Sequence, residues 1–281
     1  MKKTIFIIIL VLLLGFVIFL YLGSLFTNKF IAEKVEKIET VGKTYQDSVI
    51  TDLTGYPFSL RRYFSSSIKE NFTPPAFAEV TVNGKLRTNE KSDWTPYEAT
   101  HYYNCVIPGF VWDGWLKPQN LIWNRIIDSF EDGKANTLVK LLSSITVSDI
   151  QSGQLDQSAL TRYLLESLLF PRALFPSEYL DWERFDDSTN TLEIKYKNLS
   201  AKAKCYFNSR NELYKATTSD RYKPTGVGYT EEVLTILYSD YKWYGDFKIP
   251  TAFELQWNMP EGTFAFQKFE ITKILYDAKL N

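Results

Sequence analysis

An uncharged apolar segment near the N terminus limits the kinds of protein that this chain can be. Residues Thr4 to Phe26 carry no charged side chain and follow Lys2 and Lys3. At about 1.5 Å of rise per residue they form a helix of roughly 30 Å, the thickness of a bilayer's hydrocarbon core. A secretory signal has a shorter apolar region and small residues at its cleavage site, which Tyr21-Leu22-Gly23-Ser24 matches poorly. We therefore predict an uncleaved transmembrane signal anchor over residues 1–26, with a cleaved signal peptide as the alternative.

The lysines on the two sides of this segment do not fix its orientation, because both flanks are basic. A short tail is harder to translocate than a domain delivered by the secretion machinery, and large domains cross largely regardless of charge. We expect a single pass through the cytoplasmic (inner) membrane, with the C-terminal domain extracytoplasmic or periplasmic. Residues 27–54 then form a juxtamembrane helix and linker, with polar helix over Lys29–Glu39.

The amino-acid composition is typical of a folded domain after the linker. The formal net charge of the chain is −1, so no basic field for nucleic acid is present. The 7 Trp, 18 Tyr and 20 Phe predict either a large β-rich core or an aromatic-lined cleft. One histidine and two cysteines leave no His-rich or Cys-based metal site, and we expect no cofactor. Cys105 and Cys205 could form one disulfide in an oxidising compartment, or each could be a small buried residue.

Most of the domain shows the two-residue alternation of half-buried strands. Apolar and polar residues alternate clearly in Ala78–Leu86. Further strands are predicted at Leu192–Tyr196, Ala201–Phe207, Phe253–Met259, Trp94–Val106, Phe110–Lys117 and Leu121–Phe130. Since strands and helices do not alternate, we predict about nine or ten strands in one antiparallel sheet.

The last predicted strand, Phe264–Tyr276, changes phase near Gln267 and again near Thr272. β-bulges produce such slips, and they bend a sheet. The sheet is therefore predicted to be curved, as a half-barrel.

Two helices are predicted in the domain. The first, Pro57–Lys69, has an apolar stripe on one face. The second begins with Asp156 as N-cap and is apolar nearly all round until Pro171 ends it. A helix of this kind is buried. The predicted fold class is α+β, mainly antiparallel β, with the curved sheet of residues 55–281 packed on this central helix.

Arg162 and Glu166 are the exceptions on the apolar helix. They are four residues apart and so are neighbours on one face. If both are enclosed they must be paired, because an unpaired buried charge costs several kcal/mol. The pair is either a structural ion pair or a polar anchor for a ligand head group inside an apolar cleft.

Several motifs, taken in order, resemble a bacterial family of membrane-associated proteins of unknown function. They are Trp94-Thr95-Pro96-Tyr97-Glu98-Ala99, Pro108–Trp112, Arg162–Glu166, Phe170–Pro176, Trp182 and Ile249-Pro250. The resemblance covers roughly Gly55 to Asp277 and implies no catalytic residue. The predicted architecture is also similar to the half-barrels of periplasmic lipoprotein carriers of the LolA and LolB kind, an analogy of fold without a shared motif.

These observations favour a non-enzymatic protein that meets the lipid bilayer through its N-terminal helix and binds a lipid-like or other apolar ligand between sheet and helix. The residues predicted to line the cleft are Trp94, Tyr97, Trp112, Trp115, Arg162, Glu166 and Trp182. The aromatic residues could equally fill a β core. Two other classes stay open: an envelope hydrolase with carboxylates such as Glu98 and Glu166, and a structural or assembly partner of envelope proteins.

Overall fold

The computed structural model describes residues 2–45, 52–119, 122–184, 186 and 189–277. Its helices are α1 (Lys2–Thr44), α2 (Phe58–Ser67) and α3 (Gly153–Glu166), with short 3-10 helices η1 (Ser167–Leu169) and η2 (Pro171–Leu174). The strands are β1 (Phe77–Leu86), β2 (Thr95–Asn104), β3 (Gly109–Gln119), β4 (Ile122–Glu131), β5 (Lys134–Leu141), β6 (Ile145–Ile150), β7 (Leu180–Arg184), β8 (Thr189–Tyr196), β9 (Leu199–Phe207), β10 (Leu213–Thr218), β11 (Tyr222–Thr225), β12 (Gly228–Glu231), β13 (Val233–Ser239), β14 (Lys242–Tyr244), β15 (Phe247–Ile249), β16 (Ala252–Met259) and β17 (Gly262–Tyr276).

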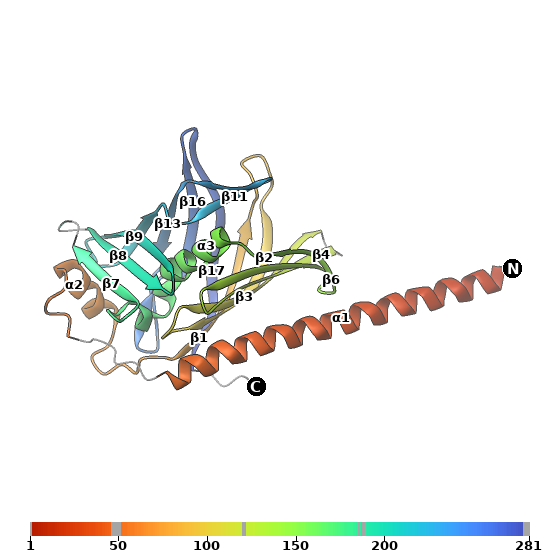
Figure 1. The fold of residues 1–281 in the computed structure, drawn as a ribbon, viewed down its shortest axis with the longest axis horizontal. Coiled ribbons are helices and arrows are strands. Elements are labelled where there is room, and N and C mark those ends of the chain that lie inside the picture. Colours follow the sequence, from red (N-terminus) through yellow and green to blue (C-terminus); the bar gives the residue numbers. More distant parts are fainter. Residues whose placement is uncertain (1, 46–51, 120–121, 185, 187–188, 278–281) are drawn as a thin grey trace.

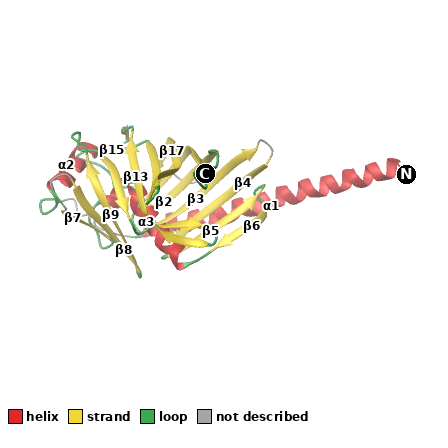
Figure 2. Ribbon diagram, turned by 90° about the horizontal axis from the view of Figure 1, so that it is seen from above, coloured by secondary structure: helices red, strands yellow, loops and turns green. Residues whose placement is uncertain are grey.

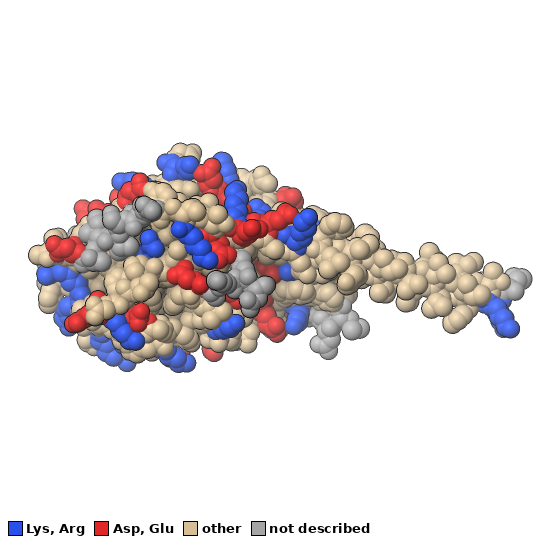
Figure 3. Space-filling view, turned by 90° about the horizontal axis from the view of Figure 1, so that it is seen from below, with Lys and Arg blue, Asp and Glu red and all other residues tan. Residues whose placement is uncertain are grey.

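Helix α1 is one continuous helix of 43 residues whose first half projects away from the sheet (Figure 1). Every side chain from Ile5 to Leu14 is more than half exposed. Beyond the body of the protein, Figure 3 shows no charged side chain on α1 until its end. The helix is long and apolar enough to cross a membrane. It continues unbroken past the predicted boundary at residue 26, and residues 46–51 of the predicted linker lie outside the described residues.

The second half of α1 packs on the sheet. Ile31, Val35 and Ile38 lie on one face of the helix and form a small core with residues of β1, β3, β4 and β5. The helical spacing of these residues explains the packing, since positions three or four apart share a face. The prediction that Lys29–Glu39 is helical and continuous with the apolar segment is confirmed.

The sheet is open and antiparallel. Its 13 strands follow the order β6-β5-β4-β3-β2-β1-β17-β16-β13-β10-β9-β8-β7. The edge strands β6 and β7 are not paired with each other, and the sheet curves around α3 (Figure 2). The predicted mainly antiparallel half-barrel on a central helix is confirmed.

The predicted number of strands was too low. The sequence analysis did not predict β5, β6, β7, β10 or β13 of this sheet. Of these, β13 is buried along most of its length and so shows no alternation. The first residue of the predicted strand Leu121–Phe130 lies outside the described residues, and β4 begins at Ile122.

Both predicted bulges are present in β17. Leu255 pairs with Gln267 and Gln256 with Ala265, so one residue of β17 is left over between them. Similarly, Thr81 pairs with Lys273 and Val82 with Ile271, which leaves Thr272 unpaired. These extra residues bend the strand near the middle of the sheet.

Helix α3 lies in the concave face of the sheet and is buried as predicted. Leu160 and Leu164 are at most 1% exposed. Its N-cap is Ser152 rather than the predicted Asp156, because the Ser152 hydroxyl accepts a hydrogen bond from the Leu155 amide at 3.1 Å. Asp156 lies in the first turn instead, and its carboxylate accepts from the Ala135 amide at 2.7 Å. Helix α2 also packs into this inner core through its predicted apolar stripe.

Candidate functional site

The residues predicted to line one cleft lie in four places. Tyr97, Trp112, Arg162 and Glu166 meet in the buried inner core. Trp94 and Trp115 lie outside this group, and Trp182 lies in another part of the inner core, on the edge strand β7.

An ion pair on α3 forms the centre of the buried group. Arg162 Nε donates to Glu166 Oε1 at 3.0 Å, and Arg162 Nη1 donates to Asp128 Oδ2 at 3.0 Å. The ring centroids of Phe110 and Trp112 lie 5.1 and 5.4 Å from the guanidinium carbon. Two carboxylates and two aromatic rings therefore surround this cation, as a buried charge requires.

Hydrogen bonds connect this pair to the one histidine of the chain. Tyr103 Oη donates to Glu166 Oε2 at 2.5 Å. Trp112 Nε1 donates to His101 Nε2 at 2.8 Å, so the His101 proton is on Nδ1, 2.6 Å from Tyr103 Oη. This tautomer is neutral, and burial lowers the pKa of His101. Burial opposes the ionisation of Glu166, yet Arg162, His101 and Tyr103 together lower its pKa to about 2.

The part of this network around His101 and Glu166 is closed to solvent. His101 is 1% exposed and Glu166 is 3% exposed. The cavity beside Arg162 has a volume of about 60 Å³, room for a few waters. The geometry matches a structural ion pair that fixes α3 to the sheet, and it gives a ligand head group no access to Glu166.

The carboxylates suggested for a hydrolase are not paired in space. Glu98 and Tyr97 are adjacent on β2, so their side chains point to opposite faces of the sheet. Tyr97 faces the core, while the Glu98 side chain is 67% exposed and lies 3.4 Å from Lys117 Nζ. Glu166 is inside the core, on the other face of the sheet. Glu98 and Glu166 therefore cannot act on one bond.

The three remaining tryptophans have separate surroundings. The Trp94 ring lies 4.7 Å from the Arg87 guanidinium carbon, near the β1–β2 turn. Trp115 is on the outer face of the sheet and stacks on Trp123, with ring centroids 6.2 Å apart. Trp182 is buried and donates to the Leu174 carbonyl at 2.7 Å. Grouping Trp112 with Trp115 was wrong because residues an odd number apart on a strand face opposite sides.

The two cysteines are separate buried thiols, so the disulfide considered from the sequence is not formed in this structure. Cys105 follows β2 and Cys205 lies in β9, six positions along the sheet order from β2. Burial raises the pKa of both thiols.

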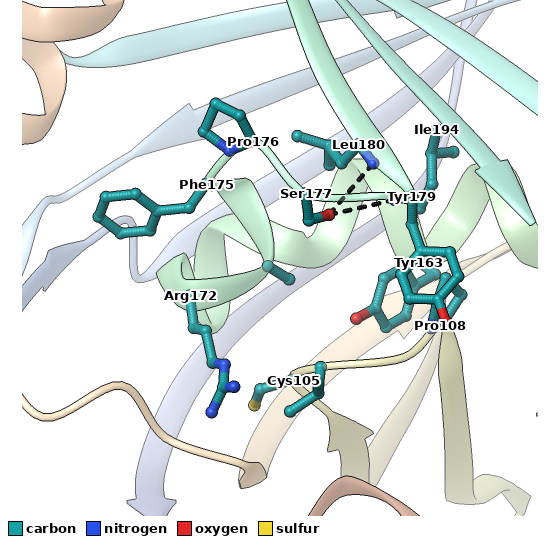
Figure 4. Close-up of a pocket in the computed structure, with 12 residues that line it drawn as sticks. Cys105, Pro108, Tyr163, Arg172, Phe175, Pro176, Ser177, Tyr179, Leu180 and Ile194 are labelled. Carbon is teal, nitrogen blue, oxygen red and sulfur yellow. Dashed lines mark hydrogen bonds between the residues drawn. The ribbon is translucent and has the colours of Figure 1, made fainter. Parts of the chain in front are cut away.

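The space between α3 and the sheet is filled by side chains. The cavity in Figure 4 has a volume of about 20 Å³ and is lined by residues that include Cys105, Tyr163, Arg172 and Tyr179. Tyr103 stacks on Phe170 at 4.4 Å between ring centroids, and other aromatic pairs fill the core in the same way. The described residues thus leave no room for an apolar ligand at the predicted place.

A larger hollow lies next to α1, at the ends of the strands. It has a volume of about 550 Å³ and lies where the β2–β3, β4–β5 and β8–β9 turns approach the second half of α1. Its apolar lining is Ile38, Val41, Ile107, Pro108, Tyr179 and Tyr196. We call this hollow the anchor groove. Another hollow, of about 670 Å³ on the outer face over β1, β17, β16 and β13, has several charged side chains in its lining.

The charged residues at the anchor groove are paired with one another. Lys37 Nζ lies 2.8 Å from Glu131 Oε2, and Lys197 Nζ lies 2.7 Å from Asp132 Oδ1. A ligand in the anchor groove would therefore contact mainly apolar surface. The sequence analysis did not predict the anchor groove, because its residues come from one helix and several turns that are distant in sequence. The one local signal was Ile107, an apolar residue in a turn.

Comparison with known proteins gives a family but no activity. The model of a family of unknown function, DUF6920, matches residues 54–276. No curated protein matches the chain.

Two solved structures are distantly similar. The chain is 13% identical to the LolA superfamily protein NE2245 from Nitrosomonas europaea, over 78% of this chain and 94% of that one, with a TM-score of 0.42. It is 12% identical to a DUF1329 family protein from Desulfovibrio piger, over 84% of this chain and 96% of that one, with a TM-score of 0.44. Neither likeness is close enough to carry an inference about function.

Proposed function

The chain belongs to the DUF6920 family of unknown function, and we propose that it is a membrane-anchored extracytoplasmic domain that binds an apolar, lipid-like molecule in the anchor groove. In this proposal α1 crosses the cytoplasmic membrane once, and the sheet domain stands outside. The proposed ligand site is the anchor groove beside α1, and not the space between α3 and the sheet, which side chains fill.

The observation that carries the proposal is that the groove is built partly on the anchor helix. Ile38 and Val41 line it, and they follow Phe26 on the same helix by about 18 to 22 Å along the axis. The volume of about 550 Å³ lies within the usual range for a small-molecule site. An apolar molecule held there leaves water while staying close to the bilayer.

Mass spectrometry of molecules that co-purify with the full chain tests this proposal. Ile107→Glu places a charge in the groove, while Val227→Glu places the same charge on a fully exposed turn of the β11–β12 hairpin. We expect a bound lipid-like molecule in the wild type and in Val227→Glu, and its loss in Ile107→Glu while that variant still unfolds cooperatively. A wild type without a bound molecule, or equal occupancy in both variants, would contradict the proposal.

A further inference from the structure

The sheet touches α1 not only through its polar half but also inside the apolar segment. The β5–β6 turn reaches furthest, because Ser144 Oγ donates to the Leu20 carbonyl at 2.7 Å. Thr27 Oγ1 donates to the Ser143 carbonyl at 2.7 Å. A side-chain carbon on Gly23 would come within 2.6 Å of Ser144 Cβ, so the glycine permits this close approach.

If α1 crosses the membrane as proposed, these contacts place one end of the sheet at the level of the membrane surface. Leu20 lies about 9 Å along the helix axis on the membrane side of Phe26, the last residue of the uncharged segment. Figures 1 and 2 both show β6 beside α1, on the side of its N-terminal half. A bilayer that covers the apolar segment therefore also meets this end of the sheet.

The residues at this end of the sheet are of the types that are common where a protein meets the surface of a bilayer. Trp123 Nε1 donates to Ser143 Oγ at 3.0 Å, and Trp115 stacks on Trp123. Both rings are half-buried on the outer face, while Ile122 next to them is 46% exposed. Tryptophan is enriched where hydrocarbon meets water, since its ring is apolar and its N–H needs a partner.

We propose that this end of the sheet, which comprises Trp115, Ile122, Trp123 and the turn at Ser143 and Ser144, is a second membrane contact that inserts into the outer interface of the bilayer beside α1. The inference rests on the proposed anchoring of α1. With two contacts the domain cannot rotate freely about its anchor, so the anchor groove keeps a fixed orientation to the lipid surface.

Depth-dependent fluorescence quenching tests this contact in the full chain. Single variants Ile122→Cys, Val227→Cys and Phe16→Cys carry the fluorophore NBD in vesicles of phosphatidylethanolamine and phosphatidylglycerol that contain a spin-labelled phospholipid. Because Cys105 and Cys205 are buried, they do not compete for the label. We expect the label at Ile122→Cys to be quenched several-fold more than the label at Val227→Cys, and the label at Phe16→Cys to be quenched most.

The three positions separate the two possible failures. If Phe16→Cys is quenched but Ile122→Cys is quenched no more than Val227→Cys, the second contact is wrong and the anchor stands. If Phe16→Cys is not quenched, α1 is not in the bilayer, and both ideas fail.

A matched pair of glycine variants tests whether α1 holds this end of the sheet in place. Gly23→Leu forces the Ser144 turn away from the helix, whereas no atom lies within 4 Å of a side-chain carbon placed on Gly15. We expect Gly23→Leu to reduce the quenching at Ile122→Cys, and Gly15→Leu to leave it unchanged. Equal quenching in both backgrounds would contradict the role given to this contact.

Discussion

Arg162 Nε lies 3.0 Å from Glu166 Oε1 inside the core, where the two side chains are 11% and 4% exposed. The guanidinium also contacts Asp128, and the carboxylate also accepts from Tyr103. Each charge therefore has several partners, and Glu166 itself is out of reach of a ligand in solvent. This relationship assigns the pair to the stability of the fold, where it joins α3 to β2 and β4.

Replacing Glu166 should destabilise the fold strongly. Glu166→Gln leaves the Arg162 cation with one carboxylate in a buried site, and breaking a buried pair costs about 3–5 kcal/mol. Chemical denaturation measures the free energy of unfolding. Glu98→Gln is the control, because the exposed pair of Glu98 and Lys117 should contribute less than about 1 kcal/mol. Equal losses in the two variants would contradict the structural role of Glu166.

Acid should destabilise the protein in two stages. Burial lowers the pKa of His101 from 6.5, so the unfolded chain binds more protons there and the free energy of unfolding falls as the pH drops below about 6.5. Glu166 titrates at about 2 instead of 4.5. Its contribution is therefore complete above about pH 4.5 and is lost as the pH falls further.

The first stage can be assigned to one residue, because His101 is the only histidine. Urea denaturation at about pH 7.5 and about pH 5.5 should show a smaller difference in His101→Gln than in the wild type. An unchanged difference would mean that another group titrates in this range.

Both thiols should be inert in the folded protein. Cys105 and Cys205 are 1% and 2% exposed, and burial raises the pKa of each. Only thiolates react readily with maleimides. Maleimide labelling should modify neither cysteine in the native state and both in urea, with or without a reductant. Two thiols that react in urea only after reduction would indicate a disulfide.

Adding a methyl group at Gly114 should disturb the buried network from the side of β3. A side-chain carbon there would lie 2.1 Å from Trp112 Cη2, so Gly114→Ala must displace the indole that donates to His101. Overpacking of this kind costs about 1–3 kcal/mol. Gly226→Ala is the control, because no atom lies within 4 Å of the added carbon. Denaturation midpoints that are equal in the two variants would contradict this packing.

The sequence predicted those parts of the fold that have a local signature. The alternation in β1, β8, β9 and β16, the two phase slips in β17 and the nearly uniform apolar surface of α3 each lie within one segment, and each prediction is confirmed. Arg162 and Glu166 were paired correctly because helical spacing alone makes them neighbours.

The candidate site could not be predicted in the same way. Whether an aromatic residue lines a cleft or fills a core depends on which strands surround it, and Tyr97 and Trp112 are buried by residues distant in sequence. The anchor groove joins Ile38 of α1 to Tyr196 of β8. Such a site depends on the curvature of the whole sheet, which no single segment encodes.

We propose above all that α1 is kept in the mature protein as the element that joins membrane and sheet. Mass spectrometric sequencing of the N-terminal region, on protein from separated membrane and soluble fractions, tests it most directly. We expect the membrane fraction to hold the protein, with Leu20 and Gly23 still covalently continuous with Thr27. A mature chain that begins after Phe26 and is recovered in the soluble fraction would contradict the account.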